Sequence, residues 1–373
     1  MAFAAAGLLL CGITVSTPFL SVLLLGGAQA SHVGSGAWAF LDEGLWMLSL
    51  MLLVTVVLVP LARLGLRVVV LGGLRQARPP RWLFLPLRWH EALTAWSMLE
   101  IFLLGALVSC IRLDAVADVH FGLAAYALGA TVLATLVADA AFQSQAAWDA
   151  LEECGAIAMP GHTPPSALGP SAVIACPCCR RLSPTVQGAP CARCGTPLHR
   201  RTPASLACTT ALLLAAALLY LPANLLPVMI VTSLGQGGAH TILGGLAEFV
   251  QAGYWPLAVL GFLASVVVPL LKLVGLTILA WLTHRRSTWA LPLRTRFYHL
   301  IKVTGRWSMV DVFVAAVLVA LVRFGALASI TAGAGAAFFG AVVILTMLAT
   351  EAFDPRLMWD ALDDGVAPLE GAR

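Results

Sequence analysis

Four cysteines in the middle of the chain have the residue type and spacing of metal ligands. Cys176 and Cys179 form one CxxC pair, and Cys191 and Cys194 form a second pair after eleven intervening residues. Two such pairs suit two knuckles that together offer four thiolates to one tetrahedral ion. The pattern therefore predicts a zinc ribbon over about 174–200.

Two alternatives at this motif stay open. Cys178 lies beside Cys179 and could replace it as a ligand. Iron could occupy the same four sulfurs, as in rubredoxin-like sites, which would make the chain a membrane redox protein. Zinc is favoured because nothing else in the sequence suggests a redox chain, and the 8 histidines lie in loops or at the ends of apolar segments.

A second set of polar residues lies inside otherwise apolar segments. Lys272 and Asp311 lie ~16 Å and ~12 Å from the same end of their segments. Isolated charges at such depths cost a few kcal/mol or more in hydrocarbon, so they pair or line a cavity. We expect a buried polar cluster of Ser265, Lys272, Ser308, Asp311 and Thr346. It would be either an ion pair that only fixes helix packing or a site coupled to protons or substrate.

Membrane-spanning helices must position these residues. The chain has 373 residues, of which 60% are hydrophobic and only 11% are charged, whereas soluble domains carry about 25% charged residues. The net charge of +4 is small and the basic residues lie in separate loops, which argues against nucleic-acid binding. A span needs ~20 mostly apolar residues, and the apolar runs are continuous as in helices rather than alternating as in barrel strands. Eight segments qualify as spans: 3–25, 46–74, 93–112, 120–141, 205–232, 254–283, 303–324 and 331–352.

Lysine and arginine set the predicted orientation. The segments 75–90, 142–204 and 284–302 are rich in basic residues, whereas 26–45 and 233–253 contain none. Basic loops of membrane proteins face the cytoplasm. We therefore expect a multi-pass protein whose two termini and ribbon are all cytoplasmic.

The two halves of the chain are related by an internal repeat. The run WSMLEIF at 96–102 reappears 211 positions later as WSMVDVF at 307–313. Further upstream the offset is 209, and the repeat matches Arg63, Ser97 and Glu100 to Lys272, Ser308 and Asp311. These three residues are the expected first-unit counterpart of the polar cluster.

The predicted fold is an all-α polytopic membrane protein. It has two repeated four-helix transmembrane units, 1–150 and 205–360, which enter the membrane in the same direction. A cytoplasmic linker, 151–204, carries the zinc ribbon, and a cytoplasmic tail, 361–373, follows the second unit.

Several motifs resemble those of the paraquat-inducible protein A family. They are the ribbon and the runs LPANLLPVM at 221–229, VPLLK at 268–272, GRWSMVDVF at 305–313 and FDPR at 353–356. The resemblance implies a bacterial inner-membrane partner of an MCE-domain protein that bridges the periplasm. Together the two would move phospholipid or another lipid between the inner and outer membranes.

In that family each four-helix unit usually follows its own ribbon, whereas here Met1 leads almost directly into the first span. We therefore expect either that the first ribbon was lost or that the start codon is assigned too late.

Other functions remain as alternatives. One is a membrane scaffold that anchors an MCE partner without transport activity of its own, and another is the redox protein with an iron-thiolate ribbon. We expect no enzyme, because the sequence contains no GxSxG, HExxH or Walker-type phosphate loop.

Overall fold

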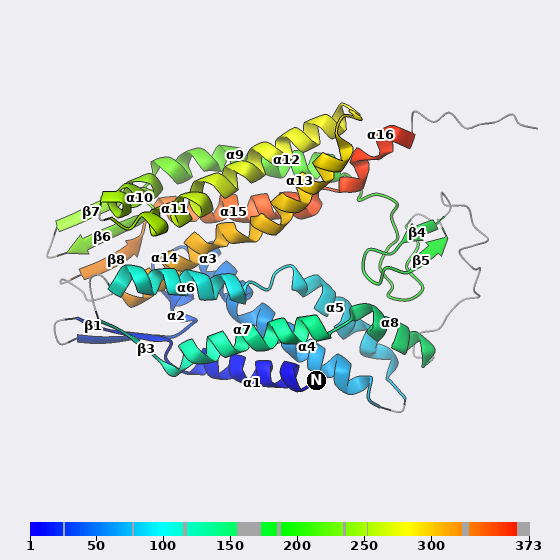
Figure 1. The fold of residues 1–373 in the computed structure, drawn as a ribbon, viewed down its shortest axis with the longest axis horizontal. Helices are drawn as coiled ribbons and strands as arrows, with labels where there is room; N and C mark the ends of the chain where they lie inside the picture. The colour runs from blue at the N-terminus through cyan, green and yellow to red at the C-terminus, as the bar shows by residue number, and fades with distance from the viewer. Residues whose placement is uncertain are drawn as a thin grey trace, which may run out of the picture. The chain divides into compact units, whose positions relative to one another are not determined.

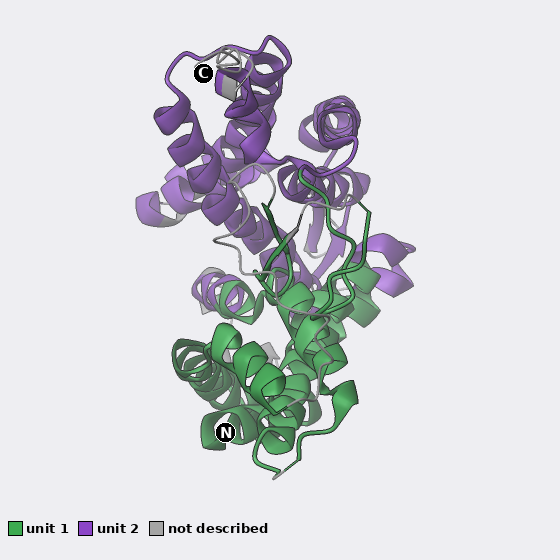
Figure 2. Cartoon of the chain, turned by 90° about the vertical axis from the view of Figure 1, so that its right-hand side faces the viewer, with its two compact units in different colours: residues 1–39, 49–103, 113–200 green, residues 40–48, 104–112, 201–373 purple. Residues whose placement is uncertain are grey.

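The computed structural model describes residues 1–24, 27–76, 78–114, 118–154, 173–184, 188–233, 236–251, 253–322 and 328–363. In these ranges the chain is mostly helical, with small antiparallel sheets (Figure 1). It groups into two compact units, which Figure 2 colours separately. Unit 1 comprises 1–39, 49–103 and 113–200, and unit 2 comprises 40–48, 104–112 and 201–373. The part 155–172 of the predicted linker lies outside the described residues, as does the predicted tail from 364 onward.

The described helices include seven stretches long and apolar enough to cross a membrane, which confirms the prediction of a polytopic helical protein. The stretches are Trp46–Gly73, Arg81–Ile111, Leu123–Ala141, Ser205–Leu225, Ala258–His284, Leu291–Leu321 and Ala334–Ala352.

In the first half, helix α1 packs against α7 and α4, and α4 also packs against α5. A three-stranded antiparallel sheet of order β2–β1–β3 lies at one end of these helices (Figure 1). In that sheet Leu20 pairs with Ser31 on one side and with Phe121 on the other. The elements are α1 (Ala2–Ser16), β1 (Leu20–Leu24), β2 (Gly27–Ser31), α2 (Ser35–Asp42), α3 (Trp46–Leu52), the π-helix η1 (Leu53–Leu58), α4 (Val59–Gly73), the 3₁₀ helix η2 (Arg81–Leu83), α5 (Phe84–Thr94), α6 (Leu99–Asp114), β3 (Asp118–Phe121), α7 (Leu123–Ala141) and α8 (Ser144–Glu153).

The second half repeats this plan. Helix α9 packs against α15 and α12, and a sheet of order β7–β6–β8 lies at one end of the helices. Met229 of the central strand pairs with His240 and with Ala332. The elements are α9 (Ser205–Leu225), β6 (Met229–Ser233), β7 (Gln236–His240), α10 (Ile242–Gln251), α11 (Trp255–Phe262), the π-helix η5 (Leu263–Val267), α12 (Val268–His284), α13 (Leu291–Thr304), the 3₁₀ helix η6 (Gly305–Met309), α14 (Val310–Leu321), β8 (Ala328–Ala332), α15 (Ala334–Ala352), the 3₁₀ helix η7 (Pro355–Met358) and α16 (Asp360–Asp363).

The strands shorten several predicted spans. The first predicted span, 3–25, is helical only to Ser16, and a helix of this length reaches ~22 Å. Thr17 has an extended backbone, with φ −104° and ψ 159°, as expected for a residue before a proline. The apolar residues that follow form β1. The predicted span 205–232 divides in the same way, into α9 and β6.

Other helices begin earlier than predicted. The spans expected at 93–112 and 303–324 belong to the longer helical stretches Arg81–Ile111 and Leu291–Leu321. Their first turns carry basic residues, which lower the local hydropathy although the backbone is helical. Much of the sequence expected as basic loop is therefore helix.

A close backbone approach recurs where each sheet meets a helix. A Cβ atom on Gly122 would lie 2.2 Å from the carbonyl oxygen of Pro18, and one on Gly333 would lie 2.2 Å from that of Pro227. Only glycine fits at such a distance. The same junction in both halves agrees with the internal repeat.

Each half also contains a π-helical turn two residues before a proline. η1 ends at Leu58 before Pro60, and η5 ends at Val267 before Pro269. π-turns are rare and frequent at functional sites. η5 carries Ser265, one of the predicted site residues.

Candidate functional site

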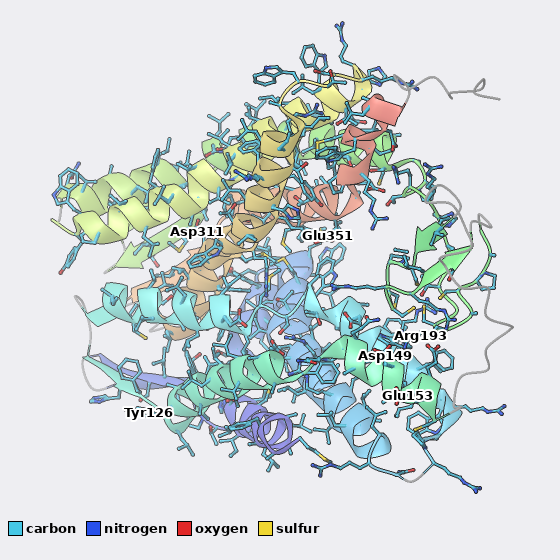
Figure 3. All side chains as sticks on the ribbon, turned by 45° about the vertical axis from the view of Figure 1, so that its right-hand side comes forward. Tyr126, Asp149, Glu153, Arg193, Asp311 and Glu351 are labelled. Atoms are coloured by element: carbon cyan, nitrogen blue, oxygen red, sulfur yellow. The ribbon has the colours of Figure 1, made fainter. Side chains whose placement is uncertain are left out.

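Five polar residues predicted from the sequence come from five elements of unit 2. Ser265 lies in η5, Lys272 in α12, Ser308 in η6, Asp311 in α14 and Thr346 in α15. Figure 3 shows Asp311 on its helix among the sticks of unit 2. The structure arranges the five residues as two adjoining groups.

Lys272 is held by two hydroxyl groups. Its side chain is fully buried, and Nζ donates to Ser308 Oγ at 2.9 Å and to Thr346 Oγ1 at 3.5 Å. Each hydroxyl donates its own proton to a backbone carbonyl three residues earlier, at 2.9 Å and 3.0 Å. Their lone pairs are therefore free to accept from the lysine. Gly305 leaves room for the lysine stem, because a Cβ there would lie 2.9 Å from Lys272 Cε.

Asp311 belongs to the second group. Its Oδ2 accepts a short hydrogen bond from Ser265 Oγ, which also lies 2.7 Å from the carbonyl oxygen of Gly261. A hydroxyl has one proton, so Ser265 donates to one of these two acceptors at a time. The acid and the backbone of the π-turn region therefore compete for the same proton.

The sequence indicated a single cluster in which Lys272 and Asp311 pair. The structure brings together the five predicted residues, but the lysine has Ser308 and Thr346 as its partners. Lys272 thus contacts Ser308 and Thr346, and Asp311 contacts Ser265.

A mostly apolar cavity of about 90 Å³ adjoins this second group and lies within unit 2. It reaches from strands β6 and β7 to Ser265 and Asp311. His240, on β7, lines the cavity, and its Nδ1 lies 2.7 Å from Oε1 of Glu248. The apolar walls include Phe40, Leu48, Leu246, Val314 and Phe339. The cavity thus has mostly apolar walls and a carboxyl group at one end.

The first-unit counterpart differs from the expectation. Arg63 does not pair with Glu100; its Nη2 lies 2.9 Å from Asp139 Oδ2. Arg67, one turn further along α4, forms a short ion pair with the same carboxylate and donates from Nε to His90 Nε2 at 3.2 Å. Glu100 is half-buried on α6.

Ser97 is buried in unit 1. The matching Ser308 is also buried, and it accepts a hydrogen bond from Lys272. Arg63, the counterpart of Lys272, instead forms an ion pair with Asp139 of α7. Asp139 was recognisable as an acid inside the predicted span 120–141, and Arg67 as a basic residue one turn from Arg63. Which acid contacts which arginine depends on how the helices pack. The repeat does not indicate this pairing, because the residue 211 positions after Asp139 is Thr350, which is not an acid.

The four predicted ligand cysteines form one buried group. Their sulfur atoms all lie within 4.8 Å of one another. Cys176 Sγ lies 3.4 Å from Cys194 Sγ, and Cys179 Sγ lies 3.7 Å from Cys191 Sγ. A tetrahedral zinc site with Zn–S bonds of about 2.3 Å requires sulfurs about 3.8 Å apart, so the donor set fits such an ion. The group contains Cys179; Cys178 is half-buried and packs against the cluster.

Both knuckles turn through a residue with a left-handed backbone. In the second knuckle this is Gly195, with φ 71°, whose N–H donates to the carbonyl of Cys191 at 2.8 Å. In the first it is Arg180, with φ 56°, whose N–H donates to the carbonyl of Cys176 at 3.0 Å. The short strands β4 (Val173–Ala175) and β5 (Leu182–Pro184) flank the first knuckle.

The thiols strongly affect one another's protonation. Hydrogen bonds from Cys176 and Cys179 lower the pKa of Cys191 to about 6. Hydrogen bonds to Cys176 and Cys191 raise the pKa of Cys179 above its usual value. A metal ion bound to the group would stabilise the fully deprotonated set of thiolates.

Comparison with known proteins places these features in a family. The sequence model of the paraquat-inducible protein A family matches residues 1–152 and 206–363. The intermembrane transport protein PqiA of Escherichia coli (strain K12) is 37% identical over 284 residues, which cover 74% of this chain and 67% of that protein. The lipophilic envelope-spanning tunnel protein A of the same strain is 31% identical over 365 residues, covering 97% of this chain and 82% of its own. A probable intermembrane transport protein of Haemophilus influenzae is 29% identical over 367 residues, covering 95% and 84%. No solved structure matches the chain.

Proposed function

Because the chain belongs to the paraquat-inducible protein A family, we propose that it is the inner-membrane component of a system that moves lipids between the inner and outer membranes. The observation that carries the proposal is the apolar cavity of unit 2, which ends at Ser265 and Asp311 among membrane-spanning helices. Its apolar walls suit an acyl chain. At its polar end, a bound lipid would lie beside Asp311 and could change the protonation of that carboxyl group. The names of the relatives, which describe intermembrane transport, support the same proposal.

The proposed orientation follows from the distribution of basic residues. The termini and the ribbon lie in the cytoplasm, and sheets β2–β1–β3 and β7–β6–β8 lie at the periplasmic ends of their helices. The cavity adjoins β6 and β7, so it lies toward the periplasmic end of unit 2. A lipid taken there is placed on the side where a periplasm-spanning partner can receive it. We propose an MCE-domain protein as that partner.

The polar residues have separate proposed roles. Lys272 holds a positive charge against Ser308 and Thr346 and fixes the packing of three elements. Asp311 exchanges a proton when the cavity opens or fills, with Ser265 turning its hydroxyl between the carboxylate and the backbone carbonyl. Acids within membrane-spanning helices commonly serve such proton relays. Transport would in this way be coupled to protons.

The ribbon is proposed to hold zinc through Cys176, Cys179, Cys191 and Cys194. When bound, the ion would neutralise the thiolates and contribute to folding, as structural sites of this ligand set do. No catalytic role is proposed for it. The redox alternative would require iron at the same four sulfurs.

A variant with a larger side chain in the cavity lining tests the transport proposal. Gly245 lies on α10 and lines the cavity, and a Cβ there meets nothing within 4 Å, so Gly245→Leu puts its side chain in open space. We expect the purified variant to lose co-purifying phospholipid, measured by mass spectrometry, and cells to lose detergent resistance. Gly129→Leu is the matched control, because Gly129 on α7 is equally open and lies outside the cavity lining.

A stably expressed Gly245→Leu protein with normal lipid content and full detergent resistance would contradict the proposal. The same result would favour the scaffold, for which the cavity has no role. Recruitment of the MCE partner, measured by co-purification, should be normal for both variants.

A double variant tests the coupling. If neither residue exchanges a proton, Lys272→Met with Asp311→Asn removes both charges at once and leaves envelope function intact in the protein that still folds. Under the coupling proposal the double variant folds and recruits the partner, yet cells fail to resist detergent. Full function of a stably expressed double variant would refute coupling while leaving the transport proposal in place.

A further inference from the structure

The ribbon is docked on helix α8 through an arginine that lies between two of the metal-ligating cysteines. Arg193 separates Cys191 from Cys194 in the second knuckle. Figure 3 shows Arg193 beside Asp149 of α8, with Glu153 further along the same helix. All of these residues belong to unit 1.

Arg193 is a buried arginine whose two acidic partners are partly exposed, Asp149 by 54% and Glu152 by 26% of their side chains. Its Nη2 lies 2.5 Å from Asp149 Oδ1, and its Nε lies 3.1 Å from Glu152 Oε2. The guanidinium carbon lies 5.9 Å from the centre of the Trp148 ring, which is itself fully buried. Only 3% of the arginine side chain is exposed. Glu152 receives a second arginine of the ribbon, since Arg181 Nη1 lies 3.3 Å away.

Apolar packing continues the same interface. The four ligand cysteines share one buried cluster with Trp148 and Leu151 of α8 and with Leu83 and Leu87 at the start of the neighbouring helix. The sulfur group is thus part of the core that joins the ribbon to the helices, rather than an appendage in solvent.

The internal repeat gives an instructive comparison. The Trp148-Asp149 pair recurs as Trp359-Asp360, and Asp360 also holds an arginine, with Arg201 Nε 3.0 Å and 2.9 Å from its two oxygens. In unit 2, however, that arginine lies outside the metal knuckles. In unit 1, by contrast, Asp149 contacts Arg193, which lies within the second metal knuckle.

We propose that Arg193 makes the ribbon a metal-dependent clamp on α8. A metal knuckle is a short loop whose backbone is fixed by the ion, and Arg193 is carried by that loop. Loss of the metal frees the loop and withdraws the guanidinium, leaving Asp149 and Glu152 without it. Because the same loop both holds the metal and places the buried guanidinium against α8, the docked and metal-bound states favour each other.

This coupling must be reciprocal. If the metal strengthens docking by some factor, docking strengthens metal binding by the same factor. A substitution on α8, 42 positions before the nearest of Cys191 and Cys194 in the chain, should therefore weaken zinc binding although it touches no ligand.

The test measures zinc affinity of the full chain in detergent by competition with a chromophoric chelator. Asp149→Asn is expected to lower the affinity by about 5- to 150-fold, the usual range of coupling between sites. Glu153→Gln is the matched control, since it removes an exposed carboxylate from the same helix and should leave the affinity unchanged. Equal affinities of the two variants would overturn the proposal.

A second measurement needs no substitution. Hydrogen exchange of the unaltered protein should rise across Ser144–Glu153 when zinc is removed by a chelator, and fall again when zinc is restored. Unchanged exchange in α8 on removal of the metal would overturn the clamp. Neither readout involves lipid movement, so the clamp and the transport proposal can fail independently.

Discussion

Removing the Ser308 hydroxyl should destabilise the protein far more than removing the Thr346 hydroxyl. Both accept from the buried Lys272, but at 2.9 Å and 3.5 Å. A hydrogen bond to a charged group contributes about 1.5–3 kcal/mol, and a contact at 3.5 Å lies beyond the usual range for a full bond. We therefore expect Ser308→Ala to cost about 2 kcal/mol through this contact and Thr346→Val less than about 1 kcal/mol.

Each hydroxyl also donates to its own helix backbone, and this contribution must be subtracted. Thr277→Val provides the correction, because Thr277 on α12 bonds the carbonyl of Leu273 at 2.6 Å and has no contact with the lysine. Unfolding of the detergent-solubilised protein by denaturant gives the free energies. Double-mutant cycles with Lys272→Met then isolate the two couplings.

The order of the couplings decides the outcome. A coupling of Lys272 to Thr346 equal to or larger than its coupling to Ser308 would refute the geometry of the site. No coupling to either hydroxyl would refute the view that the lysine is held as a charged donor.

Three further outcomes are expected. Gly333→Ala should lower the free energy of unfolding by about 1–3 kcal/mol, because the added Cβ would clash with a backbone carbonyl. Gly129→Ala should be neutral or mildly stabilising, and similar unfolding midpoints for the two variants would contradict this prediction. The protein should contain one zinc per chain by metal analysis, lost in Cys191→Ser and released as the pH falls because protons compete for the thiolates; iron with thiolate-to-metal absorption would instead favour a redox protein. Reporter fusions at Gly188 and Gly237 should lie on opposite sides of the membrane, and a periplasmic ribbon would overturn the orientation drawn from basic residues.

Much of the architecture is predictable because hydrophobic length and repeats are properties of the sequence itself. The membrane-crossing helices follow from apolar runs, and the repeat follows from WSMLEIF and WSMVDVF. The sulfur group is predictable from spacing alone, since two knuckles bring four cysteines together whatever surrounds them.

The sheets were not predictable by the same means. In β1 and β6 apolar residues follow a helix directly, so hydropathy extends the helix across Pro18 or Pro227. The long-range pairing of β1 with β3 involves residues about a hundred positions apart, and no local pattern indicates it.

The five polar residues could be selected from the sequence, whereas the contacts among them could not. Depth along a helix places Lys272 and Asp311 at similar levels, yet the direction of each side chain depends on helix rotation. The π-turn η5 alters that rotation just before Lys272. In the first half, likewise, depth did not reveal that Arg63 and Arg67 share Asp139.

The two π-turns also bear on how the halves came to differ. A turn of this kind holds one residue more than an ordinary helical turn, and it stands at the same distance before Pro60 and Pro269. Such a shared irregularity is most simply inherited from the single ancestral unit that was later duplicated. The position of Ser265 is occupied in the first copy by Val56, so the hydroxyl beside the acid is a difference between copies within a common backbone. On this view the backbone irregularity predates the duplication, and the difference between Ser265 and Val56 arose after it.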